Sequence, residues 1–195
     1  MLKINSLLLT ILLAFAQAVS AHEMGAEAQP TSIAIYIQAQ DYNHPIRLRT
    51  YSEGHWYSQG PMLEAAAVKV LGADFKEVAM CDTNPSAAKV LVWLRPRMFY
   101  NPQVQTYYGK VLAYVYTADG KPLANYVGKA EKFGLFGIKM DNTLNAVYQA
   151  AMQATSAKMQ ADPKFQEALK GPSTALPCAT TSLLPEPKIQ FMSFQ

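Results

Sequence analysis

Histidine, cysteine and charged residues are all scarce in this chain, and each scarcity argues against a class of function. Three of the 195 residues are histidine and two are cysteine, so the sequence offers little material for a metal centre of the His/Cys type. Charged residues make up 16% of the chain and the formal net charge is +3. No basic cluster alternates with aromatic residues, so we expect no nucleic-acid partner.

The sequence also lacks the short motifs that carry catalysis. It has no G-x-S-x-G elbow, and the Gly134–Gly137 stretch (GLFG) lacks the third glycine and the lysine of a phosphate-binding loop. Carboxylates are sparse in the middle of the chain, where Asp119 belongs to a turn and Glu131 ends a strand, so no pair is placed for acid–base work. We therefore expect a protein that is not an enzyme and holds no cofactor or metal.

What is present begins with a predicted signal peptide at residues 1–21. A positive charge at Lys3 precedes the apolar run Leu7–Phe15, and small residues lead to a cleavage site after Ala21, with Ala18 as the competing site. No cysteine stands at either site, so no lipid anchor is expected. No later apolar run is long enough to cross a bilayer, so we expect no transmembrane segment in the mature chain and a periplasmic location.

Two cysteines, Cys81 and Cys178, remain in the predicted mature chain. An even number of cysteines in an exported protein most simply means a disulfide. Such a bond would close a long loop and stabilise the fold by about 4 kcal/mol in the chain-entropy model. It would also pin the proline-rich tail at residues 171–195, which we expect to be extended, whereas residues 22–30 are expected to be a flexible lead-in.

Residues 31–170 are predicted to form a single α+β domain. Period-2 alternation predicts strands, and apolar residues at i, i+3, i+4 and i+7 predict helices. Together these patterns predict an antiparallel-rich mixed sheet with two main helices packed on it, in the order β-α-β-β-β-α. The expected strands are 31–39, 76–81 and three within Ala87–Gly137, joined in part by the Asp119–Gly120 turn; the expected helices start at Pro61, stopping at Gly72, and at Asp141 or Asn142, with a short third at Pro163–Leu169.

Two stretches carry a resemblance to a known group of proteins. The strand Ala87–Val92 (AAKVLV) and the hairpin Asp119–Leu123 (DGKPL) are similar to the strand and turn of the small α/β domain of Gram-negative envelope proteins. That group includes the amino-terminal domain of TolB, CsgG and PelC. The resemblance implies a periplasmic accessory or assembly part that works through protein contacts with envelope or export proteins, or with a second copy of itself.

Aromatic residues close to arginines form the predicted interaction surface. Tyr, Trp and Arg are the residues that dominate binding energy at protein interfaces. The alternative is that these residues fill the core or are ordinary strand residues. The residues of this predicted surface are Trp56, Tyr57, Trp93, Arg95, Arg97 and Tyr100.

Two other functions stay open at this level. Stacked tryptophan and tyrosine rings could bind a small ligand or a glycan. If cleavage follows Ala21, the mature chain begins at His22, and an amino-terminal histidine could bind copper together with His44 or His55. The simpler interpretation of His22 is a solvated side chain.

The segment between the first strand and the first helix, Gln40–Gly60, is rich in aromatic and polar residues. A short strand, Ile46–Tyr51, is expected within it, and the rest is expected to be a loop.

Overall fold

The computed structural model describes residues 31–75, 77–81, 87–173 and 177–184. The predicted signal peptide, the lead-in and His22 lie outside these described residues, as does the end of the tail. The described part forms an α+β fold, as the sequence predicted.

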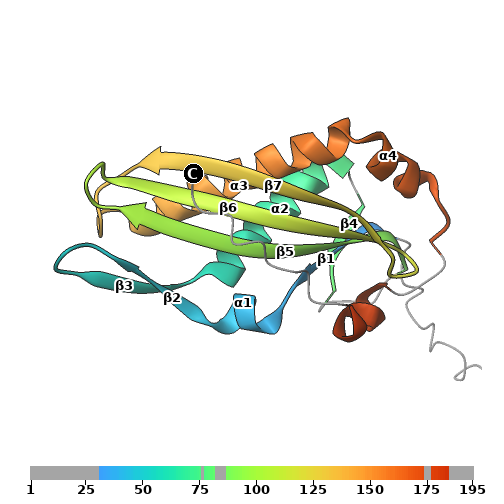
Figure 1. Cartoon of the computed structure of the whole chain (residues 1–195), viewed down its shortest axis with the longest axis horizontal. Coiled ribbons are helices and arrows are strands. Elements are labelled where there is room, and N and C mark those ends of the chain that lie inside the picture. Colours follow the sequence, from blue (N-terminus) through green and yellow to red (C-terminus); the bar gives the residue numbers. More distant parts are fainter. Residues whose placement is uncertain (1–30, 76, 82–86, 174–176, 185–195) are drawn as a thin grey trace, which may run out of the picture.

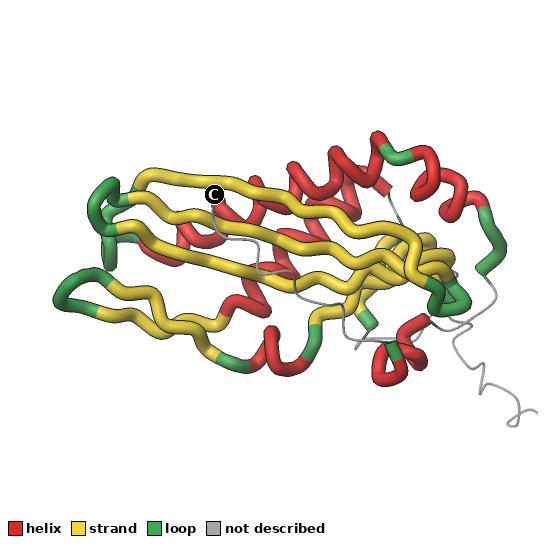
Figure 2. Tube along the Cα trace, viewed as in Figure 1, coloured by secondary structure: helices red, strands yellow, loops and turns green. Residues whose placement is uncertain are grey.

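A five-stranded mixed sheet organises the molecule (Figures 1 and 2). The strand order across it is β4-β1-β5-β6-β7, with β1 parallel to both of its neighbours and β5, β6 and β7 forming an antiparallel meander. The strands are β1 (Thr31–Ile37), β4 (Val78–Met80), β5 (Ala88–Asn101), β6 (Thr106–Thr117) and β7 (Pro122–Phe133).

Two long helices cover one face of this sheet (Figure 2). They are α2 (Gln59–Phe75) and α3 (Met140–Ala161), followed by the short α4 (Pro163–Lys170). Alternation along the strands turns Ile33, Ile35, Val90 and Val92 toward the helices, where all four are buried. The main core therefore lies between the sheet and α2 and α3, because each strand places every second side chain on that face.

The opposite face of the sheet has a second, smaller core near the start of β5. Leu91 and Trp93 from β5 pack there with Tyr114 and Tyr116 from β6. The 3₁₀ helix η1 (Pro177–Leu183) lies beside β1 on this side, within the tail that was expected to be extended. This part of the sheet is therefore covered on both faces.

A two-stranded ribbon replaces most of the loop expected between β1 and α2. After the short helix α1 (Ala39–Asn43), strands β2 (Pro45–Arg49) and β3 (Gly54–Ser58) pair antiparallel. The turn between them is closed by the Thr50 N–H, which donates to the Glu53 carbonyl at 2.8 Å. The prediction of a loop after Ile46–Tyr51 was wrong. The sequence pattern there is weak because each ribbon strand buries only one side chain, Leu48 in β2 and Tyr57 in β3.

Two helix boundaries also differ from the sequence prediction. Helix α2 begins two residues before Pro61 and runs through Gly72 to Phe75, whose ring packs edge-on against that of Phe165 at 5.5 Å. Helix α3 begins at Met140, after Lys139 in a left-handed conformation (φ 47°), so Asp141 lies in its first turn and does not cap it.

At Gly128 in β7 the backbone of α3 lies directly against the sheet. A Cβ atom there would collide with the Ala151 carbonyl oxygen and the Thr155 hydroxyl, and would lie 2.9 Å from the Thr155 backbone nitrogen. We expect Gly128→Ala to lower the free energy of unfolding by about 2 kcal/mol, because helix backbone must move. Gly72→Ala is the matched control: a Cβ there meets nothing within 4 Å, and a helical alanine should raise stability by about 1 kcal/mol. Equal effects in urea unfolding would contradict this packing.

Candidate functional site

Exposed apolar side chains gather at one end of the molecule. Five of them belong to the end of β5, the β5–β6 turn, the end of β7 and the loop that leads into α3; we call these residues the apolar end. Phe133 is 67% exposed and Ile138 is 60% exposed, values that are high for large apolar side chains. The apolar end comprises Phe99, Val104, Phe133, Leu135 and Ile138.

The strand register places these segments together. Phe133 is paired with Thr106 at the start of β6, and Phe99 packs against Tyr108 with ring centroids 6.1 Å apart. The Gly134 N–H donates to the Gln105 carbonyl at 2.9 Å, which ties the loop after β7 to the β5–β6 turn. Figure 1 shows this turn and the end of β7 at the same end of the molecule as the turn of the β2–β3 ribbon.

The loop between β7 and α3 contacts buried tyrosines of β5 and β6. The hydroxyl of Tyr100 donates to the Gly134 carbonyl and that of Tyr107 to the Leu135 carbonyl, both at 3.4 Å. The Phe136 ring packs on Tyr100 with centroids 5.1 Å apart. Phe136 is therefore the apolar residue of this loop that turns inward, while Leu135 and Ile138 stay outside.

Burial, together with the neighbouring Tyr100, raises the pKa of Tyr107 to about 12. The hydroxyl therefore stays protonated and remains a hydrogen-bond donor throughout the neutral range. The hydrogen bond from Tyr107 to the Leu135 carbonyl is therefore kept over the same pH range.

The β2–β3 ribbon adds two exposed aromatic rings, Tyr51 and Trp56. The guanidinium of Arg47 lies 5.9 Å from the centre of the Trp56 ring, in a cation–π arrangement. On its inner side the ribbon is anchored by Tyr57, whose hydroxyl lies 3.4 Å from that of Tyr148. Burial raises the pKa of both hydroxyls, so this contact is between neutral groups.

Most of the predicted interaction surface is buried. Trp93 is 3% exposed because it packs against Tyr36 and Tyr114, with ring centroids at 5.5 and 6.3 Å. Tyr100 is 4% exposed and lies on the helix-covered face, since its position alternates with that of Arg97. The physical reason is that both faces of β5 are covered where these rings lie.

The charged and ribbon members of that surface divide in the same way. Arg95 and Tyr57 are buried, whereas Trp56 and Arg97 remain accessible. Arg95 Nε donates to Asp41 Oδ2 at 2.9 Å, and Arg97 Nη1 lies 3.6 Å from Asp41 Oδ1. This ion-pair cluster joins α1 to β5, so its arginines have a structural partner within the chain.

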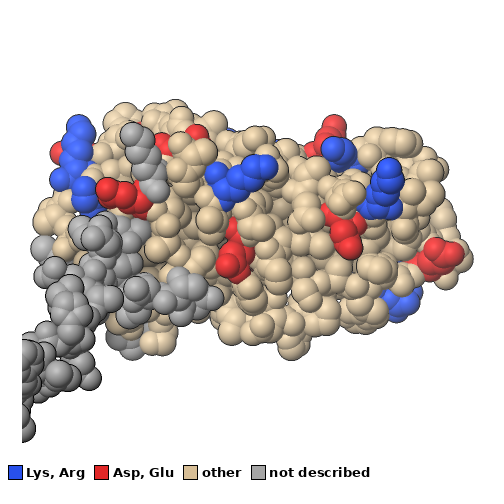
Figure 3. Space-filling model, turned by 180° about the vertical axis from the view of Figure 1, so that it is seen from behind, with Lys and Arg blue, Asp and Glu red and all other residues tan. Residues whose placement is uncertain are grey.

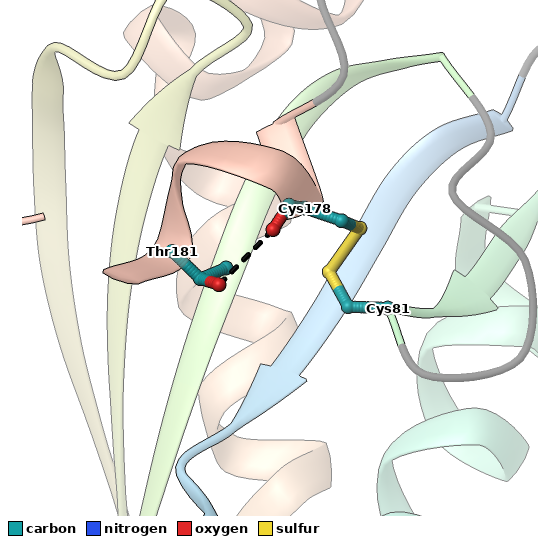
Figure 4. Close-up of a disulfide and its surroundings, with 3 residues drawn as sticks. All are labelled: Cys81, Cys178 and Thr181. Carbon is teal, nitrogen blue, oxygen red and sulfur yellow. Dashed lines mark hydrogen bonds between the residues drawn. A yellow bond between two sulfur atoms is a disulfide. The ribbon is translucent and has the colours of Figure 1, made fainter. Parts of the chain in front are cut away.

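The remaining end of the molecule carries the disulfide between Cys81 and Cys178 (Figure 4). The bond joins the end of β4 to η1 across 97 residues of sequence, and it is the pairing that the sequence predicted. No other cysteine is present in the described part of the chain. A disulfide is typical of proteins from oxidising compartments.

The described part of the chain offers little support for a metal site or a charged binding surface. No group of three or more His, Cys, Asp or Glu side chains there is placed to hold a metal ion. His44 lies just before β2 and His55 pairs with Leu48 in the ribbon, whereas His22, with which either was predicted to bind copper, lies outside the described residues. Figure 3 shows the helix-bearing side with charges scattered singly or in small mixed groups.

The apolar end was missed by sequence reasoning. Its signal was the stretch Phe133–Ile138, where apolar residues alternate with two glycines beyond the end of a strand. Such a stretch is equally compatible with a buried corner, and only the structure shows which rings turn outward.

No helix among the described residues is both long and apolar enough to cross a membrane. No protein-family model matches the chain, and no curated protein sequence matches it. A search of solved structures finds a crystal structure described as a "putative lipoprotein" from Caulobacter crescentus CB15, with 13% sequence identity and a TM-score of 0.33, covering 58% of this chain and 85% of that one. Likeness at this level carries no argument, and the resemblance to the TolB-type domain stays a prediction.

Proposed function

We propose that this is an exported, non-catalytic accessory protein that binds another protein of the cell envelope through its apolar end. In the periplasm it would assist the assembly, export or stability of an envelope complex. One observation carries the proposal: an exposed apolar loop accepts hydrogen bonds at two of its carbonyls from buried tyrosines. The disulfide supports the compartment.

Exposure of the apolar end is costly for a protein that acts alone. Single exposed apolar residues are common, but neighbouring ones mark surfaces that another molecule covers. Phe133, Leu135 and Ile138 fall within six residues and are all exposed. The hydrogen bonds from Tyr100 and Tyr107 to the loop carbonyls would lower the conformational-entropy cost that a partner meets on binding.

The charges around the loop favour a protein partner over a lipid surface. The exposed charged residues that flank it in the sequence are Glu131, Lys132, Lys139 and Asp141, two of each sign. Attraction to anionic lipid needs a clear excess of Lys and Arg. Mixed charges around an apolar centre are the usual composition of a protein interface.

A site-specific photo-crosslinking amino acid tests this proposal in the native host. We expect an analogue at Leu135 to form a discrete adduct with an envelope protein, because this position points out of the fixed loop. An analogue at Val68, equally apolar and exposed on α2, is the matched control and should give no such adduct. Adding Phe133→Ser and Ile138→Ser should remove the adduct without changing the thermal midpoint, since both side chains are exposed.

Three outcomes would contradict the proposal: adducts with lipid alone, the same adduct from both positions, or none from Leu135. An adduct with a second copy of the chain would identify self-association as the function of the apolar end. The glycan platform predicted from the sequence requires stacked exposed rings; Trp93 is buried and Trp56 is exposed, and we propose no second function on Trp56 alone.

A further inference from the structure

A cavity of about 430 Å³ lies at the C-terminal end of β1, beside the disulfide. Strand β1, helix α1, the end of β4 and the 3₁₀ helix η1 surround it. Figure 4 shows η1 and the Cys81–Cys178 bond next to β1. Its lining includes Tyr36, Ile37, Ala39, Tyr42, Asn43 and Thr181.

The neighbouring strand stops short at this cavity. Strand β4 ends at Met80, which pairs with Ile35, whereas β1 continues to Ile37. The Ile33 N–H donates to the Glu77 carbonyl, and the Cys81 N–H donates to the Ile35 carbonyl at 2.9 Å. The backbone groups of these odd-numbered β1 residues therefore face β4.

The same alternation turns the N–H of Ile37 toward the side that β4 has left. The β1–β4 pairing ends at Ile35 and Met80, and no backbone hydrogen bond outside the strand pairs joins the Ile37 N–H to another described residue. An unpaired strand edge next to a cavity is a template for one more strand, and added strands are a common way of binding extended peptides.

The chemistry of the lining limits what can enter. The lining residues are apolar, aromatic or neutral polar, and none carries a charge. The Thr181 hydroxyl donates to the Cys178 carbonyl at 3.0 Å, and the Tyr42 hydroxyl donates to Glu64 at 2.6 Å, so both already have acceptors. Asn43 is exposed at the rim with an amide that can donate and accept.

We propose that this cavity binds an extended, uncharged peptide segment of a partner chain, which pairs with β1 at Ile37 where β4 ends. The segment's carbonyl accepts from the Ile37 N–H, and its apolar side chain fills the space between Tyr36, Ala39 and Tyr42. The disulfide holds η1 against β1 and so keeps one wall of the site in place. This site is separate from the apolar end and does not depend on it.

Amide hydrogen exchange on the free protein is the first test. The Ile35 amide faces paired β4, whereas the Ile37 amide has no described acceptor, so we expect Ile37 to exchange about 100-fold faster than Ile35. Equal protection of the two amides would show that the edge is already paired and would overturn the proposal.

Titration of the ¹⁵N-labelled protein with the capped peptide acetyl-Val-Thr-Val-Ile-amide is the second test. We expect shifts centred on Tyr36, Ile37 and Asn43, a downfield Ile37 amide, and slowed exchange at that amide. Ala39→Trp, which fills the exposed mouth of the cavity, should abolish these shifts, whereas Val68→Trp on α2 should retain them. The proposal fails if the peptide shifts the two variants equally, or if no shift appears at Ile37 up to the solubility limit.

Discussion

Replacing both Cys81 and Cys178 with serine is expected to lower the free energy of unfolding by about 4 kcal/mol, because the bond closes a loop of nearly one hundred residues. The cross-link removes extended states of the unfolded chain, and the loss grows with the length of the closed loop. In the native state the bond also joins η1 to the end of β4. Urea unfolding monitored by tryptophan fluorescence measures the difference.

A reductant provides the control for this prediction. Dithiothreitol should lower the stability of the wild-type protein to that of the double serine variant and leave the variant unchanged. A difference below about 1 kcal/mol between the two proteins would show that the unfolded chain gains little freedom from losing the bond. Since the bond also keeps η1 against β1 at the proposed peptide site, the variant should bind the capped peptide acetyl-Val-Thr-Val-Ile-amide more weakly.

The sheet could be predicted because its strands alternate clearly. Val90 and Val92 turn to the helix-covered face, and Leu91 and Trp93 to the other, as period-2 spacing requires. The buried stripe of α2 followed in the same way from its helical spacing. These patterns are local, so a single sequence carries them.

The exposure of Trp93 could not be predicted, because it depends on contacts between distant segments. Alternation shows that Trp93 and Val92 point to opposite faces of the sheet. It does not show whether the face that carries Trp93 is open to solvent or covered by other segments. Tyr36 from β1 and Tyr114 from β6 cover Trp93 here. Tyr100 was wrongly placed on the surface for a different reason. It is an odd number of residues from Arg97 along β5, so the two side chains point to opposite faces of the sheet and Tyr100 lies on the helix side.

The apolar end and β3, the second strand of the ribbon, were missed for a related reason. Strand β3 buries a single side chain, so it lacks the repeated alternation that marks a strand. The outward direction of Leu135 and Ile138 depends on Tyr100 and Tyr107, which hold the loop from strands far earlier in the chain. Sequence spacing carries no information on such an anchor.

Replacing Asp41 with alanine is the second change expected to destabilise the protein strongly, by about 3 kcal/mol. Its Oδ2 atom lies 2.9 Å from Arg95 Nε, and the two side chains are only 10% and 8% exposed. Removing the carboxylate leaves the Arg95 charge buried without this ion pair, which costs more than the pair itself contributes. Because Asp41 lies in α1, the link from α1 to β5 would also be lost.

Two further variants separate a buried-charge effect from a simple loss of contact. The double variant Asp41→Ala/Arg95→Met should recover most of the stability, because no charge then remains buried at position 95 and the methionine keeps an apolar stem. Glu167→Ala removes the exposed Lys170–Glu167 pair, whose side chains are 74% and 77% exposed, and should change stability little. If the double variant were as unstable as Asp41→Ala alone, the cost would come from the geometry of α1.

The apolar end should bind its proposed partner normally in the double variant, because its anchors, Tyr100 and Tyr107, contact neither residue of this ion pair in any hydrogen bond described.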